Sequence, residues 1–170
     1  MNATLLTAAD RFVATLAVGA KQAAHLEWSR KRLFQDNIDA RWVEALAERP
    51  ELAERLEAFV SRYGRLQDTL ADKLLPRWLL ALAEKPGSQI EVLNRAERLG
   101  VIEDVARWLE ARQLRNRLVH EYITDSDVFA KDLQLAEAYR RMLVATLWRL
   151  RDDASTRLGL PADQLPGDIG

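Results

Sequence analysis

The eight residues from Arg115 to Tyr122 concentrate the side chains of this chain that could carry out chemistry. They read Arg-Asn-Arg-Leu-Val-His-Glu-Tyr and include one of the chain's two histidines and one of its three tyrosines. Histidine exchanges a proton near neutral pH, and arginine binds a phosphate and stabilises charge developing on it. Arg115 and His120 could therefore let an RNA 2′-hydroxyl attack its adjacent phosphate without a metal, and Tyr122 adds a nucleophilic or modifiable hydroxyl.

The spacing of Arg115 and His120 limits how they could share one substrate. Five positions along a continuous helix are about 140° of rotation and about 7.5 Å of rise, whereas neighbours on one face are three or four apart. One phosphate would meet both side chains if the helix loosens near Val119, or if a second copy of the segment faces the first. The second alternative predicts a homodimer with a shared site.

The helix that carries this segment is predicted to run over about 101–119. On a helical wheel, one arc of this helix is apolar and holds Val101, Val105, Trp108 and Val119. Arg112 and Arg115 lie within this arc or beside it. A buried arginine is costly unless it is paired or its head reaches a cleft. We therefore expect Arg112 and Arg115 either to pair with a carboxylate inside the bundle, with Asp68 as the candidate, or to open onto an interface.

The remaining segments show helical rather than strand periodicity. The predicted helices cover about 4–35, a short segment around Trp42 capped by Asn37 or Asp39, 51–83 with a kink or break near Leu75 caused by Pro76, 89–99 after a capping box that begins at Ser88, and 127–157. In the last helix, the residues expected to point inward are Phe129, Leu133, Leu135, Tyr139, Leu143, Leu147 and Leu150. The sequence thus predicts an all-α, up-and-down bundle of about five helices. It forms one domain over 1–158, followed by a disordered tail over 159–170.

The overall composition narrows the class of protein. The formal net charge of −1 gives no global basic field, and the absence of cysteine excludes disulfides, thiolate metal sites and cysteine nucleophiles. No basic N-terminal region or bilayer-length apolar run is present, so we expect a cytoplasmic protein without membrane association. We expect no cofactor and no metal site. The five tryptophans are expected in the core, and residues 30–32 at a solvated helix end.

The pattern Arg-x4-His-x-Tyr, formed by Arg115, His120 and Tyr122 with Asn116 directly after the arginine, resembles the motif of the HEPN superfamily. The tyrosine narrows the resemblance to HepT-like toxins of HEPN/MNT toxin–antitoxin pairs. The similarity covers roughly residues 61–122, and the flanking helices match only as a generic bundle. The N-terminal portion is longer than in compact members of the family.

The resemblance implies a dimeric, metal-independent ribonuclease in which arginine and histidine from both subunits line one cleft. It assigns phosphate binding to Arg115, proton transfer to His120 and support of the active geometry to Asn116. The cognate antitoxin of such a toxin is a minimal nucleotidyltransferase, which can transfer AMP to the motif tyrosine, here Tyr122, and silence the ribonuclease. The implied partners are RNA, this nucleotidyltransferase and a second copy of the chain.

Three plainer interpretations rest on the same residues. The bundle could bind a nucleotidyltransferase and present Tyr122 to it without cleaving RNA. It could also be a purely structural dimer in which Arg115 belongs to an internal ion pair. At the level of single side chains, His120 could cap helix carbonyls and Tyr122 could pack under the next helix.

Overall fold

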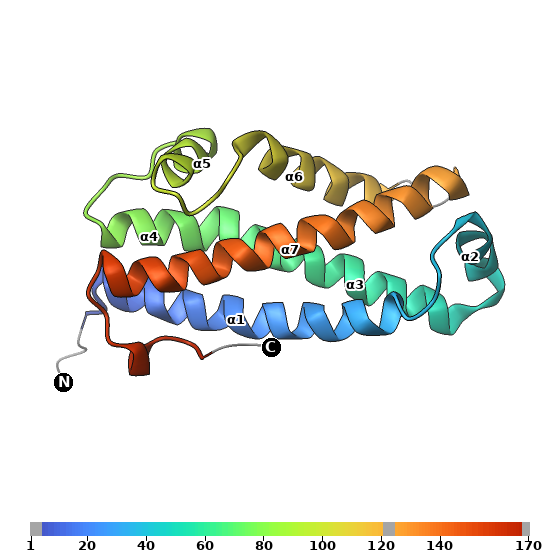
Figure 1. The fold of residues 1–170 in the computed structure, drawn as a ribbon, viewed down its shortest axis with the longest axis horizontal. Helices are drawn as coiled ribbons and strands as arrows, with labels where there is room; N and C mark the ends of the chain where they lie inside the picture. The colour runs from blue at the N-terminus through green and yellow to red at the C-terminus, as the bar shows by residue number, and fades with distance from the viewer. Residues whose placement is uncertain (1–4, 121–124, 168–170) are drawn as a thin grey trace. The chain divides into compact units, whose positions relative to one another are not determined.

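The computed structural model describes residues 5–120 and 125–167. Over these residues the chain folds into helices and contains no strand, which confirms the predicted all-α helical bundle (Figure 1). The α-helices in chain order are α1 (Ala8–Leu33), α2 (Ala40–Glu44), α3 (Pro50–Asp68), α4 (Leu75–Ala81), α5 (Gln89–Arg98), α6 (Val105–His120) and α7 (Ser126–Thr156). Short 3₁₀ segments follow α2 and α7, at Ala45–Glu48 and Ala162–Gln164.

The described residues divide into two compact units. The first unit comprises those within 1–21, 68–105 and 144–170, and the second those within 22–67 and 106–143. Helices α1, α3, α6 and α7 each contribute residues to both units, α3 only its last residue to the first. The predicted single domain over 1–158 stays a prediction.

Local sequence signals set several helix ends, and those at Asp39 and Ser88 were predicted. Asp39 accepts a hydrogen bond from the backbone N–H of Trp42 at 2.9 Å, and so caps α2. Ser88 and Glu91 form the predicted capping box, with each side chain accepting from the other residue's backbone N–H. Gly100 adopts φ 79° just after α5, a left-handed conformation that favours glycine at a helix C-terminus.

The helix is irregular directly before Pro76, at the position where the sequence predicted an irregularity. The chain does not break there: a π-helical segment, Thr69–Leu74, joins α3 to α4, and α4 begins with Leu75 and Pro76. Proline has no N–H to donate and clashes one turn back along an α-helix. The wider π turn directly before Pro76 accommodates this without ending the helix.

In the first unit, a buried polar pair joins α4 to α7. The indole of Trp78 is fully buried, and its Nε1–H donates to Asp153 Oδ2 at 2.6 Å. The other carboxylate oxygen of Asp153 accepts from Arg157 one turn along α7. Beyond α7, Leu165 is 9% exposed and lies beside the 3₁₀ segment Ala162–Gln164, within the region expected to be disordered.

In the second unit, aromatic residues of α3 fill the core. Phe59 and Tyr63 are fully buried, and the ring of Phe34 meets Phe59 edge-on with centroids 5.4 Å apart. Tyr63 Oη donates to the carbonyl oxygen of Ala111 at 3.2 Å, which ties α3 to α6. Burial raises the pKa of Tyr63, so its hydroxyl remains a neutral donor.

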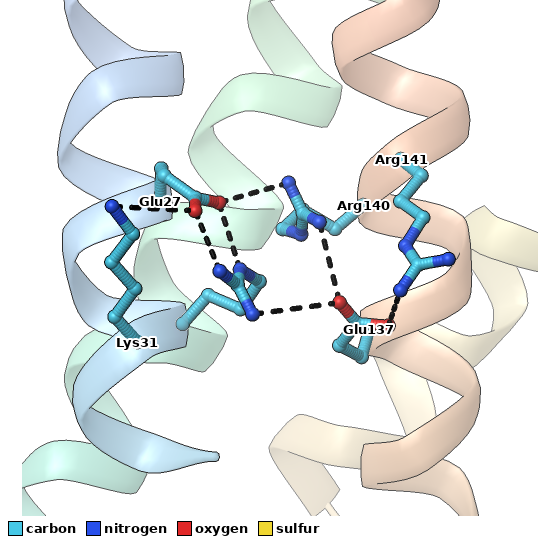
Figure 2. A network of polar contacts seen from close by, with 6 residues as sticks. Glu27, Lys31, Glu137, Arg140 and Arg141 are labelled. Carbon is cyan, nitrogen blue, oxygen red and sulfur yellow. Dashed lines mark hydrogen bonds and ion pairs between the residues drawn. The ribbon is translucent and has the colours of Figure 1, made fainter. Parts of the chain in front are cut away.

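At the helix end over residues 30–32, Lys31 and Arg32 are exposed as predicted, whereas Arg30 is not. Arg30 is partly buried and donates to both carboxylate oxygens of Glu27, at 2.8 and 2.6 Å. Arg140 of α7 pairs with the same Glu27 at 3.0 Å and with Glu137 at 3.2 Å (Figure 2). Alternating charges therefore join α1 to α7. The pKa of Glu27 is lowered, mainly by the hydrogen bond from Arg30.

Outside α6, Trp28 and Leu135 were predicted to be buried and are exposed. Trp28 is 57% exposed, with the guanidinium of Arg32 4.8 Å from its ring centroid, whereas Trp42, Trp78 and Trp108 are buried as predicted and Trp148 is half-buried. Leu135 of α7 is 39% exposed and so is not on the inward face. Periodic steps of three and four include Leu133 and Ala136, both fully buried, and exclude Leu135.

Candidate functional site

Helix α6 buries a different face from the one predicted. Its buried residues are Trp108, Ala111, Leu114 and Leu118, at steps of three and four. Val119, placed in the apolar arc by the sequence, is 54% exposed. The prediction followed the valines and the tryptophan and left out an alanine and two leucines, which define the actual stripe.

Arg115 lies at the border of this buried stripe, and its side chain crosses α3 at Gly64. A Cβ atom built at Gly64 would lie 2.8 Å from Arg115 Nε, 3.4 Å from Cγ and 3.5 Å from Cζ. Arg115 is partly buried and Gly64 is buried. The guanidinium therefore occupies space that any side chain at position 64 would need.

Gly64 is the site residue that sequence reasoning missed. By its type and position alone, Gly64 is only a weak point of its helix, because glycine in a helix interior costs about 0.5–1 kcal/mol relative to alanine. Its backbone does not require glycine, since it lies within α3 and has no positive φ. An unexplained glycine inside a strongly patterned helix was the available signal, but the sequence does not say which side chain uses the space.

Arg115 and Gly64 border a pocket of about 270 Å³ in the second unit. Its lining is mainly aliphatic and comprises Leu46, Ala53, Leu56, Glu57, Val60, Ser61, Gly64, Arg115, Leu118, Val119 and Phe129. Glu57, Ser61 and Val119 are exposed, so the pocket reaches the surface, while Phe129 is 2% exposed. One guanidinium beside apolar walls is suited to a ligand that carries an anionic group next to an apolar one.

Polar contacts fix α6 on either side of Arg115. Arg117 makes a two-point ion pair with the buried carboxylate of Asp132 on α7, with both N–O distances 3.1 Å. The hydroxyl of Tyr139 donates to Glu110, and burial, followed by this hydrogen bond, raises the pKa of Tyr139. Together with the Tyr63 bond to Ala111, these contacts hold the helix that presents Arg115.

The other predicted site residues are described to different extents. Asn116 is exposed on α6, and Asp68 is the partly buried last residue of α3. Pairing of Asp68 with Arg112 or Arg115 stays a prediction. The side chain of His120 and the whole of Tyr122 lie outside the described residues.

The backbone of α6 tests one of the two ways in which Arg115 and His120 could meet one phosphate, namely a loosening of the helix near Val119. The α-helix is continuous from Val105 to His120, so it does not loosen near Val119. The Cα positions of Arg115 and His120 are therefore about 140° apart around one helix axis. Sharing one phosphate would therefore require a second copy of the segment facing the first, and this dimer stays a prediction.

Comparisons with known proteins add no relative. No family model, no curated protein and no solved structure matches the chain. The resemblance to HEPN proteins thus rests on the motif residues themselves.

Among residues 5–120 and 125–167, no group of three or more His, Asp or Glu side chains is placed to hold a metal ion. Within the same ranges, none of the helices combines the length and apolar character needed to cross a bilayer.

Proposed function

We propose that this chain is a metal-independent endoribonuclease of the HEPN superfamily, acting in the cytoplasm as the HepT-like toxin of a toxin–antitoxin pair. The observation that carries the proposal is the Arg-x4-His-x-Tyr pattern of the sequence, whose arginine lies on α6 at the border of a surface pocket. The all-α bundle agrees with it. Arg115 is held at this place by contact with Gly64 and by the anchored helix around it.

The proposed reaction is an attack of an RNA 2′-hydroxyl on its own 3′-phosphate. His120 accepts the hydroxyl proton as the new O2′–P bond forms, and the P–O5′ bond breaks. The leaving O5′ takes up a proton, so the products are a 2′,3′-cyclic phosphate and a free 5′-hydroxyl. The guanidinium of Arg115 binds the phosphate and stabilises the additional negative charge in the transition state.

The proposed active form is a homodimer. Because α6 is continuous through His120, an arginine from one copy and a histidine from the other can approach one phosphate more readily than two residues of the same helix. A twofold axis would produce two such pairs in one cleft. Asn116, next to the arginine, and Asp68, at the end of α3, are the proposed supporting residues.

The proposed regulator is a minimal nucleotidyltransferase. Transfer of AMP to the hydroxyl of Tyr122 would form a phosphodiester there and release pyrophosphate from ATP. The added nucleotide would place a negative charge and a large group two residues from His120. Both effects oppose the binding of an RNA phosphate.

The test is cleavage of a fluorescently labelled single-stranded RNA by the purified protein in the presence of EDTA. We expect the wild type to produce 2′,3′-cyclic phosphate ends and His120→Ala to lose the activity. The matched control is His25→Ala, which removes the chain's other histidine, an exposed residue of α1. Equal cleavage by the wild type and His120→Ala would reject the assignment.

The lining of the pocket favours a second candidate function. Its walls are mainly aliphatic, and Val119 at its edge is 54% exposed, as in surfaces that bind proteins. In this alternative the bundle is a non-catalytic partner that presents Tyr122 to a nucleotidyltransferase. A stable complex with the enzyme, together with no ribonuclease activity of the unmodified protein, would favour it.

A further inference from the structure

We propose that Gly64 is a positioning residue, which sets the place of the Arg115 guanidinium by leaving it the space above α3. The inference rests on the proposed function of Arg115 as the phosphate-binding residue. It extends the site beyond the motif to a residue on another helix. Neither the motif nor the pattern of the helix assigns a role to this glycine.

The backbone gives no reason for glycine at position 64. The positive-φ glycines of the described chain are Gly87, Gly100 and Gly159, and each lies outside the α-helices. Gly64 instead lies well inside α3, where alanine would favour the helix. A requirement for space is the remaining explanation.

The side chain of Arg115 lies closest to this space. The three atoms nearest to a Cβ built at Gly64 all belong to Arg115, and the nearest is Nε at 2.8 Å. Ordinary contact with a Cβ begins at about 3.4 Å, so a methyl group would displace the guanidinium end by roughly half an ångström or more. The arginine can make this movement because it is flexible, so the expected consequence is a misplaced cation in an intact fold.

Gly19 of α1 provides a matched comparison in the first unit. A Cβ there would lie 2.9 Å from Leu147 Cδ1 and 3.8 Å from Leu74 Cδ2, nearly the same crowding as at Gly64. Leu147 and Leu74 are both fully buried, so the crowding falls on packed core. Alanine should therefore lower stability at Gly19 and move Arg115 at Gly64.

The experiment compares Gly64→Ala, Arg115→Ala, the double variant and Gly19→Ala in the full chain. For each variant, the melting temperature and the single-turnover rate of RNA cleavage are measured, the latter well below the lowest melting temperature. Gly64→Ala should keep or raise the melting temperature and cleave about a hundredfold more slowly, because a misplacement near 1 Å can have an effect of this size. Gly19→Ala should melt earlier and keep its cleavage rate.

The double variant decides whether Gly64 acts through Arg115. If it does, adding Gly64→Ala to Arg115→Ala should cause no further loss of cleavage, because the misplaced group is already absent. A wild-type rate for Gly64→Ala would overturn the proposal. The proposal would also be overturned if the fold-decrease in cleavage rate of the double variant equalled the product of the fold-decreases of the two single variants.

A second measurement does not depend on cleavage. The Nε–Hε signal of Arg115 in a ¹H–¹⁵N NMR spectrum, assigned by its loss in Arg115→Ala, should shift in Gly64→Ala and stay in place in Gly19→Ala. If the wild type cleaves no RNA, the proposed ribonuclease function fails, and this signal still decides the role of Gly64. An unshifted signal in Gly64→Ala would contradict the positioning role.

Discussion

In the first unit the indole of Trp78 donates to the buried carboxylate of Asp153, whereas in the second unit the guanidinium of Arg115 crosses Gly64 and borders a pocket. The first contact is enclosed, with a fully buried indole and a carboxylate 6% exposed. The second places a partly buried charge where the pocket reaches the surface. Both contacts place polar groups beside a packed core. Of the two, the contact at Gly64 is the one that leaves a polar group, the Arg115 guanidinium, beside a pocket that a ligand could enter.

Gly19 of the first unit and Gly64 of the second differ in the same way, between enclosed core and the border of a pocket. Gly19 leaves space for a leucine of the core, and Gly64 leaves space for a charged side chain. The first serves the close packing of helices, which is a general requirement of bundles. The second gives space to a charged side chain at the border of a pocket, so under the proposed function we assign its purpose to the site.

The largest effect on stability is expected from Asp153→Ala in the first unit. The change leaves the buried indole N–H of Trp78 without its acceptor and removes the partner of Arg157. The free energy of unfolding should fall by about 3 kcal/mol. Urea denaturation measures it, and Asp152→Ala, at an exposed neighbour on the same helix, is the control. A change below about 1 kcal/mol would show that this pair is not a main structural contact.

A smaller effect is expected from Tyr63→Phe in the second unit. The substitution removes the hydroxyl that donates to the carbonyl of Ala111 and keeps the buried ring. We expect a loss of about 1 kcal/mol in unfolding free energy, the usual net value of one hydrogen bond. Because this bond ties α3 to the helix that carries Arg115, cleavage should also slow. Loss of stability with an unchanged cleavage rate would limit the role of Tyr63 to folding.

The charged network of the second unit predicts a dependence on pH. The pKa of Glu27 is lowered, first by the hydrogen bond from Arg30, so its contribution to stability is fully present above the ordinary glutamate pKa of 4.5. That contribution is lost as the pH falls through the lowered pKa of the folded state. Glu27→Gln should therefore be less stable than the wild type by about 1 kcal/mol at pH 7, with the difference shrinking in acid. A difference that is constant with pH would contradict this origin.

The smallest effect is expected at Leu135 of α7. This side chain is 39% exposed, so Leu135→Ala should change the unfolding free energy by less than about 1 kcal/mol. Leu133→Ala, at a fully buried position of the same helix, should lower it by about 3 kcal/mol. Equal losses in the two variants would show that the inward face of α7 is wrongly assigned.

Local chemistry was predictable from the sequence, and contacts between helices were not. Ser88, Asp39 and Gly100 act on backbone groups within a few residues, so their types and positions were sufficient to place helix ends. Pro76 gave the position of an irregularity, but the choice of a π turn over a break depends on the packing of the surrounding helix.

The candidate site was predictable only in part for the same reason. Arg115 was recognised by its motif, and its place at the border of the buried face was expected. The inward face of α6 was misjudged at Val119, because alanine and leucine define it. The contact with Gly64 joins two helices far apart in the sequence, and no local pattern encodes such a pair.

The central claim is that Arg115 and His120 of facing copies form one ribonuclease site, and complementation tests it directly. Arg115→Ala and His120→Ala chains are co-expressed with different affinity tags, and the mixed dimer is purified through both. Each parent dimer lacks one member of every pair, whereas the mixed dimer retains one intact pair of two. We predict that both parents are inactive and that the mixed dimer cleaves RNA at about half the wild-type rate. A mixed dimer as inactive as its parents would contradict the account.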